Sequence, residues 1–463
     1  MLCSKKTIVT ALGVLCTQLA LAAPTAEEAA ELGKSLTPLG AIKAGNKEGT
    51  IPEWTGGLCT PPAGYAPKNG AKGGTPYVDA FADDKPLLKI NAQNMAQYAD
   101  KLDEGTQELM RRYPDTFYVQ VFPTRRSACF PNWVYENNIK HVMRPKIVGS
   151  DIPSLDGAHA QTPFPIPKNG VEAVWNGLVP YRPLESYNNY LNYYVDSSGR
   201  GTVIDDKIVY EKNPYWDNSV EMIPDEKPYN LQLSRAVYPP AAVGTMTLGW
   251  TFRRPDLRGD PVWSYIPGQR RVRLAPEFAY DGVPPNAGGT FLFDEGGGFK
   301  GKMNKFDFKL LGRKEMYIPY NSNTEALSAG PEVNLANHVD PAVMRWELHR
   351  VWVVEATLKP GERHVQQRKM MYYDEDSWKI AIYQGIDHSG KVHHHDYFML
   401  RQSYEKPGLE FANFITMDFS KRAYSHWMFT GKQGVSEKFG TLMEKDIADN
   451  WFTPQGMTAM GVR

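Results

Sequence analysis

The sequence feature that most constrains the fold is a stretch of alternating residues from Trp346 to Tyr404. It holds four runs that are rich in β-branched and aromatic residues. Polar turn sequences separate these runs, at Pro360-Gly361, Asp374-Glu375-Asp376 and Ser389-Gly390. Runs of this composition with short turns between them predict β-strands that pair in chain order. The stretch therefore predicts an antiparallel meander, and the rest of the chain can be arranged around it.

The alternation within these runs predicts a sheet with one face that is drier than the other. Such a sheet needs a cover, a closed barrel or a ligand. If the sheet is curved, the apolar residues of three neighbouring runs share its concave face. We expect them either to line a ligand cavity or to form a dry core beneath helices, and the sequence leaves both open. These residues are Trp352, Val354, Trp378, Ile380, Phe398 and Leu400.

The composition favours a mainly β protein and excludes some functional classes. Hydrophobic residues make up 42% of the 463, which is enough for a substantial core, and the 40 glycines and 35 prolines indicate many turns. Basic and acidic residues are equal in number, with 52 of each. Nucleic-acid binding is therefore not suggested.

Residues 1–22 have the pattern of a cleavable signal peptide. Two lysines precede an apolar run from Ile8 to Leu21, and Ala20-Leu21-Ala22 supplies a small-x-small cleavage sequence. No later stretch approaches the roughly 20 apolar residues that a membrane helix needs. We therefore expect a mature chain without a transmembrane segment, soluble in the periplasm or peripheral to the outer membrane.

Signal cleavage would also remove Cys3 and Cys16, two of the four cysteines. Cys59 and Cys129 then remain in an oxidising compartment, and we expect them to form a disulfide bond. Two unpaired buried thiols are the alternative. On the chain-entropy model, closing a loop of about 70 residues stabilises the native state by about 4 kcal/mol.

The remaining sequence divides into an amino-terminal arm, residues 23–170, and a half-barrel, residues 171–463, which we expect to form one continuous domain. In the arm, a capping-box sequence starts at Thr25, and two short helices are predicted between Asn91 and Arg112. Short strands are predicted on both sides of Cys129. The Gly- and Pro-rich segment before the two helices is too aromatic for a free linker, so it is expected to lie extended over the body.

The half-barrel is expected to begin with a helix and to continue mainly as strands. The expected elements outside the meander are a helix at Val171–Leu178, hairpins over Tyr187–Tyr210 and Val262–Ala275, strands at Val243–Arg253, Arg313–Pro319 and Phe411–Phe419, and a helix at Val435–Ile447.

Four sequence words occur in order along the chain: LTPLGAIKAGNKEGTIPEWTGG, WSYIPGQRRVRLAP, RKEMYIPYNS and LHRVWVVEATLKPGERH. Through these words, nearly the whole mature chain resembles the bacterial "domain of unknown function 1329" family, which is grouped with the LolA/LolB-like lipoprotein carriers. The resemblance implies an incomplete antiparallel β-barrel wrapped around helices, with an apolar cavity and no catalytic motif. Members of the family often occur beside an outer-membrane β-barrel protein and a large efflux-type transporter.

Two clusters of titratable residues invite a chemical interpretation, and we expect neither to be a catalytic centre. On a strand, His393 and His395 project to one face and His394 to the other, so exposed imidazoles are expected rather than a metal site. Asp294 and Glu295 precede three glycines and are expected to lie in a solvated turn. No Gly-x-Ser-x-Gly elbow and no His-Glu-x-x-His motif occurs in the sequence.

The sequence therefore favours a periplasmic binding or carrier protein for a lipid-like or otherwise hydrophobic molecule, with no cofactor, metal or catalytic residue. The alternative is an adaptor that presents the same apolar face to an outer-membrane barrel or an inner-membrane transporter. A metal-dependent hydrolase built on the histidines ranks last. The identity of the ligand and the oligomeric state do not follow from the sequence.

Overall fold

The structure is a computed structural model that describes residues 23–65, 78–275, 280–284, 288–328, 330–404, 406–429 and 447–461. The predicted signal peptide and most of the predicted helix Val435–Ile447 lie outside the described residues. Within the described ranges the protein is mainly β, with a few short helices, as the sequence predicted.

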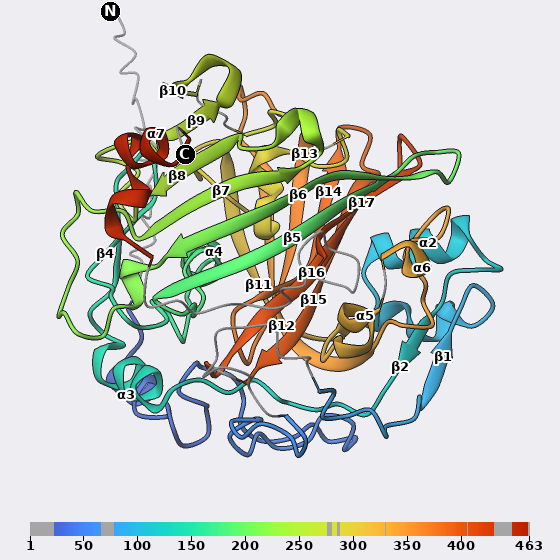
Figure 1. The fold of residues 1–463 in the computed structure, drawn as a ribbon. Helices are drawn as coiled ribbons and strands as arrows, with labels where there is room; N and C mark the ends of the chain where they lie inside the picture. Colours follow the sequence, from blue (N-terminus) through green and yellow to red (C-terminus); the bar gives the residue numbers. More distant parts are fainter. Residues whose placement is uncertain are drawn as a thin grey trace, which may run out of the picture.

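One large, curved sheet forms the body of the molecule (Figure 1). Its ladders are antiparallel, except where Trp346 pairs in parallel with Val121. Another strand, β11 (Phe306–Pro319), pairs with β12, and β3 (Lys146–Val148) and β4 (Ser154–Asp156) form a separate pair. From one edge to the other the sheet contains β1 (Leu88–Ile90), β2 (Val119–Val121), β12 (Trp346–Leu358), β13 (Gln366–Asp374), β14 (Ile380–Asp387), β15 (Val392–Ser403), β16 (Gly408–Asp418), β17 (Ala423–Phe429), β5 (Glu185–Val195), β6 (Gly201–Lys212), β7 (Asn230–Tyr238), β8 (Met246–Thr251), β9 (Val262–Ile266) and β10 (Arg271–Leu274).

Short helices cover parts of this sheet and the loops between its strands. None of the described helices combines the length and the apolar composition needed to cross a bilayer. The α-helices are α1 (Ala26–Ala29), α2 (Glu104–Arg112), α3 (Asn132–His141), α4 (Gly170–Leu178), α5 (Asn323–Leu327), α6 (Gly330–Val333) and α7 (Pro454–Gly461). The 3₁₀ helices are η1 (Met95–Lys101), η2 (Pro214–Trp216), η3 (Pro240–Ala242), η4 (Pro267–Gln269), η5 (Phe293–Gly298) and η6 (Asp449–Phe452).

The predicted meander is confirmed as strands β12 to β15, which pair in chain order. Both of its faces are covered, which explains why neither face reads as fully polar. Helix α4 contacts β11 and β12, and it approaches so closely that a Cβ added at Gly177 would lie 2.2 Å from the Tyr373 ring. Helix α2 covers β15, where a Cβ at Gly105 would lie 2.4 Å from the His395 ring.

The segment after Cys129 contradicts the sequence prediction. Residues Asn132–His141 form helix α3 rather than a strand. Val134 and Asn138 stand one helical turn apart and are both buried. The Asn138 side chain accepts a hydrogen bond from the Thr162 backbone N–H at 2.8 Å. This long-range contact outweighs the strand preference of the local aromatic and β-branched residues.

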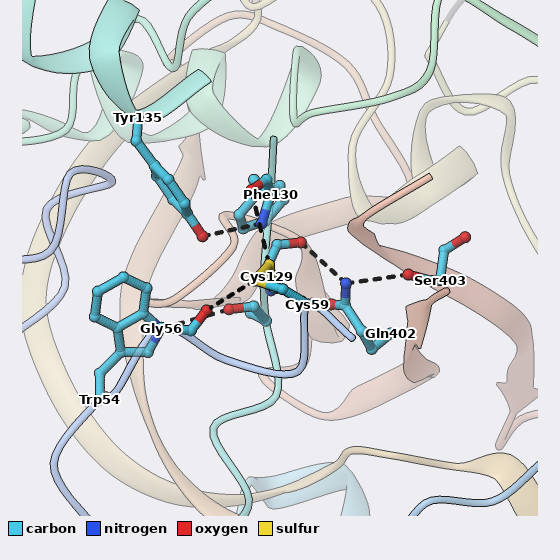
Figure 2. The surroundings of a disulfide bond; sticks show 9 residues. Trp54, Gly56, Cys59, Cys129, Phe130, Tyr135, Gln402 and Ser403 are labelled. Atoms are coloured by element: carbon cyan, nitrogen blue, oxygen red, sulfur yellow. Dashed lines mark hydrogen bonds between the residues drawn. A yellow bond between two sulfur atoms is a disulfide. The ribbon is translucent and has the colours of Figure 1, made fainter. Parts of the chain in front are cut away.

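The amino-terminal arm lies extended over the body and is tied to it, as predicted. The predicted capping box at Thr25 is present at the start of α1. The predicted disulfide bond joins Cys59 to Cys129, with their Cα atoms 5.3 Å apart (Figure 2). Gln402 of β15 donates a hydrogen bond to the Cys129 carbonyl at 3.0 Å, so the bridge is anchored to the meander as well.

Two hydrophobic cores hold the described residues together. The larger core contains residues of the arm, such as Leu39 and Ile51, together with the meander. The smaller core lies where η6 and α7 contact strands β7 to β10. It contains Leu233, Met246, Leu248, Tyr265, Ile447, Phe452 and Met457. The larger core contains residues on both sides of residue 170. The division into an arm and a half-barrel at this point stays a prediction.

Candidate ligand site inside the half-barrel

The six residues predicted for the concave face are all buried in the larger core. Trp352 is the most exposed of them, at 7%. Its ring stacks on that of Trp378, with 5.6 Å between centroids. The meander therefore brings these side chains together, while their role in lining a ligand cavity stays a prediction.

Segments from elsewhere in the chain cover part of this group. The Trp378 indole N–H donates a hydrogen bond to the Leu39 carbonyl of the arm at 2.9 Å. Ile380 packs against η5, since a Cβ added at Gly298 would lie 2.2 Å from the Ile380 Cδ1 atom. This part of the interior is filled by protein.

Another part of the interior is polar and is reached by water. Lys300, which follows η5, is exposed, yet its pKa is lowered, mainly because the surrounding protein desolvates its ammonium group. Tyr190 of β5 is half-buried, and desolvation raises the pKa of its hydroxyl well above the ordinary value. Lys379 is only 4% exposed, and burial lowers its pKa to about 7. Water access combined with desolvation indicates a recess between protein walls.

The curvature of the sheet creates this recess. Glu211 influences the pKa of both Lys300 and Lys379. Glu211 is in β6, whereas Lys379 immediately precedes β14, which lies five strands away in the sheet order. Five strand spacings would place these strands about 24 Å apart in a flat sheet. Because Glu211 acts on both lysines, we infer that the curved sheet (Figure 1) brings β6 and the start of β14 toward each other on its concave side.

The carboxylates of the recess are held by partners other than the two lysines. Glu211 accepts a hydrogen bond from Gln232 at 2.7 Å and lies 3.6 Å from the Arg182 guanidinium. Glu410 accepts a hydrogen bond from Arg401 at 2.9 Å. Within the described part of the chain, neither the Lys300 nor the Lys379 ammonium group has a hydrogen bond or an ion pair.

An aromatic wall adjoins the recess at Lys379. The Lys379 Nζ atom lies 5.2 Å from the centroid of the Phe411 ring. The Phe411 ring lies 5.1 Å from Phe398, which in turn stacks on Phe414 at 5.2 Å. Leu400 pairs with Phe411 across the β15–β16 ladder. Two of the six predicted residues, Phe398 and Leu400, are therefore next to the recess.

The recess itself was missed by the sequence analysis, although one signal for it was present. Lys379 interrupts an apolar run between Trp378 and Ile380. Trp378 has a φ of 60°, so the strict alternation of faces fails at this point. Tyr190 and Lys300 carried no local signal, because they reach the site from β5 and from the loop after η5.

The predicted solvated turn at Asp294 and Glu295 is wrong. Helix η5 folds onto β14 and leaves these carboxylates only 2% and 0% exposed. Asp294 accepts a hydrogen bond from Lys369 at 2.7 Å and lies 3.1 Å from the His364 Nε2 atom. Burial alone would raise the pKa of Asp294, but Lys369 and His364 outweigh it and keep this pKa below its ordinary value.

The predicted exposure of the histidines is also wrong, because His394 and His395 are 2% and 0% exposed. Their predicted separation between two faces is confirmed. His394 Nδ1 lies 2.8 Å from Glu295 of η5, whereas His395 Nδ1 lies 3.6 Å from Asp103 at the start of α2. Burial alone would lower the pKa of His394, but the negative charge of Glu295 outweighs it and raises this pKa to about 10. The cluster therefore contains a buried ion pair.

A surface hollow with a volume of about 320 Å³ is lined mainly by charged residues of α2 and of the β14–β15 turn. His393, Glu108, Arg112 and Lys391 contribute to it. None of the six predicted residues lines this hollow. It is therefore distinct from the interior recess.

One group of described residues has the spacing of a metal site. Ligand atoms of His349, Asp374 and Asp376 lie within 4.8 Å of one another. However, Arg126 donates two hydrogen bonds to Asp376, at 2.8 and 2.6 Å, and His349 lies 3.1 Å from Glu347. A guanidinium group that holds both carboxylate oxygens competes with a cation. We interpret the group as an ion-pair network that ties the Arg126 segment to the meander.

Fold and recess together define an open antiparallel half-barrel. Its concave side combines an aromatic wall with ammonium groups that no described residue pairs. A family model described as "Protein of unknown function (DUF1329)" matches residues 89–458. The chain belongs to this family, as its four sequence words predicted.

Several known proteins are similar to this chain. "Uncharacterized protein PA3922" of Pseudomonas aeruginosa is 38% identical over 389 residues, which cover 82% of this chain and 81% of that protein. A putative outer membrane lipoprotein-sorting protein domain from Vibrio parahaemolyticus superposes with a TM-score of 0.42 at 11% identity, covering 62% of this chain and 98% of that one. A DUF1329 family protein from Desulfovibrio piger gives a TM-score of 0.40 at 13% identity, with coverage of 59% and 91%. A LolA superfamily protein from Nitrosomonas europaea gives 0.34 at 10% identity, with coverage of 62% and 97%.

Proposed function

We propose that the protein is a periplasmic binding or carrier protein for a hydrophobic, lipid-like molecule, and that it is not an enzyme. The observation that carries this proposal is the concave side of the half-barrel. There the aromatic wall of Phe398, Phe411 and Phe414 adjoins a recess that water reaches at Lys300. Small-molecule sites commonly combine apolar walls with a few polar groups. An apolar chain against such a wall gains about 0.8 kcal/mol for each buried methylene.

Two features support a periplasmic location. The first is the signal-peptide pattern of residues 1–22. The second is the bond between Cys59 and Cys129, because disulfides persist in oxidising compartments and are rare in reducing ones.

Native mass spectrometry of protein purified from the periplasm tests the proposal. A carrier should release lipid-like molecules of defined mass when the complex is activated, and organic extraction should recover the same molecules. The stripped protein should then bind a fluorescent long-chain probe in titration. If the purified protein contains no such molecule and the stripped protein binds neither a charged nor a neutral long-chain probe, the proposal is wrong.

The adaptor function remains a second candidate because one edge of the sheet exposes apolar side chains. Strand β10 ends the sheet among the described residues, and next to it Ile266 and Leu274 are 43% and 64% exposed. An exposed edge strand can pair with a strand of another protein. If the protein is an adaptor, cross-linking through a cysteine introduced at position 274 should capture a stoichiometric protein partner. A cysteine introduced on the covered face of β8 is the control and should capture none.

A further inference from the structure

The recess contains two ammonium groups that have no ion-pair partner among the described residues. Another buried lysine of the same fold does have one. Lys369 is fully buried, and its ammonium group donates to Asp294 at 2.7 Å. Lys379 is almost as buried at 4% exposure, and within the described residues its ammonium group faces only the Phe411 ring. Leaving a buried charge unpaired is costly, so such a group indicates a partner outside the described residues, and a bound ligand can supply one.

The charges around Lys379 favour a negative partner. The groups that act on it come from several elements: Arg182 before β5, Glu211 in β6 and Glu410 in β16. Both carboxylates are already held, Glu211 by Arg182 and Gln232 and Glu410 by Arg401. Lys300 adds another ammonium group without an ion pair among the described residues, and Asp260 is the acidic group with the largest influence on its pKa. The two lysines therefore leave positive charge in the recess.

A hydroxyl group completes the polar end of the recess. Glu211 and Glu410 influence the pKa of both Tyr190 and Lys379, and we infer that the Tyr190 hydroxyl lies on the same part of the concave side. In the described part of the chain its hydroxyl has no hydrogen-bond partner. A tyrosine hydroxyl and two ammonium groups are all donors to a carboxylate or phosphate oxygen.

The aromatic rings beside Lys379 indicate where the apolar part of a ligand would lie. The Phe411 ring next to Lys379 continues to Phe398 and Phe414. Polar donors at one end and aromatic rings along one side fit an amphipathic molecule, with its head group at the lysines and its chain along the rings. A free inorganic anion would use only the first part of this arrangement.

We propose that Lys379, Lys300 and Tyr190 bind the acidic head group of an amphipathic ligand, a carboxylate or phosphate, whose apolar chain lies along Phe411, Phe398 and Phe414. This proposal rests on the proposed carrier function and names the class of molecule that it serves. The head group would give the Lys379 ammonium a charge-assisted hydrogen bond, which it does not form with the described residues.

The test compares a fluorescent long-chain acid, cis-parinaric acid, with its uncharged methyl ester on protein stripped of copurified lipid. The wild type should bind the acid about tenfold more tightly than the ester, the effect of one charge-assisted hydrogen bond. Lys379→Met should lower the affinity for the acid to that for the ester and leave the ester unchanged. Lys300→Met should have a smaller effect in the same direction. Lys314→Met, which removes an exposed lysine of β11, is the matched control and should change neither affinity.

Each outcome separates this proposal from the carrier function on which it rests. Equal and tight binding of acid and ester, or undiminished acid binding by Lys379→Met, would overturn the head-group assignment and leave the carrier function standing. Binding of neither probe by the wild type would reject the carrier function itself. Displacement of the acid by inorganic phosphate alone would assign the recess to a free anion and overturn the amphipathic ligand. Circular dichroism of each variant shows that it is folded before the comparison is made.

Discussion

At the scale of single residues, a buried ammonium group that serves to bind a ligand lowers the stability of the protein when no ligand is bound. Lys379 has a pKa of about 7 against an ordinary value of 10.5. Between these pH values the unfolded chain binds the proton and the folded chain does not, so stability rises with pH across this window. The cost of Lys379 is therefore greatest near or below pH 7.

Replacing this lysine should consequently stabilise the protein. Lys379→Met is expected to raise the free energy of unfolding by about 1 to 3 kcal/mol near pH 6, because it removes a buried group that no described residue pairs. The gain should shrink as the pH rises from 7 to 10.5, and the wild-type lysine becomes neutral in both states only above 10.5. Urea titrations of the empty proteins near pH 6 and at the upper end of this range measure this difference. A loss of stability at the lower pH would contradict our description of Lys379 as unpaired.

The ion pair between Glu295 and His394 predicts the opposite pH dependence of stability. The pKa of His394 is about 10, above its ordinary value of 6.5, so the stability it contributes is fully present below about pH 6.5 and is lost as the pH rises toward 10. Glu295→Gln should cost about 3 to 5 kcal/mol near pH 6, because the buried imidazolium then keeps only Asp418, 3.5 Å from its Nε2 atom, as an acidic partner. The cost should fall as the pH approaches 10.

Glu108→Gln is the matched control for this prediction. Glu108 forms an ion pair with Arg112 on α2, where both side chains are partly exposed. Surface pairs of this kind contribute about 0 to 1 kcal/mol. If thermal and urea denaturation gave equal losses for Glu108→Gln and Glu295→Gln, the buried pair would have no special role.

The errors of the sequence analysis at this scale have one physical cause. A sequence such as Asp294-Glu295 followed by glycines resembles a solvated turn, because its neighbours are small and polar. Its partners His364, Lys369 and His394 lie 70 to 99 residues further along the chain. Local sequence does not contain such contacts, so it cannot distinguish a solvated acid from a buried one.

At the scale of elements, prediction succeeded where the pattern was local. The strands of the meander alternate over eight or more residues, and the sequence located all four. The Val171–Leu178 helix was likewise found within one residue of its bounds. Helix α3 was mistaken for a strand, because Asn138 is fixed by Thr162 rather than by its neighbours. The alternation also fails at register shifts such as that between Tyr372 and Tyr373.

The link between the arm and the body is also an element-scale feature. The Cys59–Cys129 bond closes a loop with a sequence separation of 70. Replacing both cysteines by alanine should lower the free energy of unfolding by about 4 kcal/mol on the chain-entropy model. Differential scanning calorimetry of the double variant beside the oxidised and reduced wild type measures this effect. Reduction of the wild type should reproduce the double variant, and an unchanged melting temperature in both would show that the arm is held without the bond.

At the scale of the whole molecule, the curvature of the sheet is the property that the sequence did not reveal by itself. Strand order and bending together place Glu211 of β6 where it influences the pKa of Lys379, at the start of β14. Only the family resemblance led to the expectation of an incomplete barrel. The interior then divides into a filled part beneath α4 and η5 and a recess at Lys300, Lys379 and Tyr190. The apolar pattern alone predicted the first part and missed the second.

The division of the interior into a filled part and a recess leads to a prediction for Val354, in the middle of β12. Its side chain is fully buried and lies on the strand that α4 contacts, further along the sheet from the recess. Val354→Phe should therefore overpack a filled core and cost about 1 to 3 kcal/mol of stability, while the affinity for cis-parinaric acid stays unchanged. Val365→Phe, at a position that is 47% exposed, is the control and should change neither property. If Val354→Phe instead kept its stability and lost affinity for the probe, the cavity would extend beneath α4, and all six residues of the concave face would belong to the ligand site.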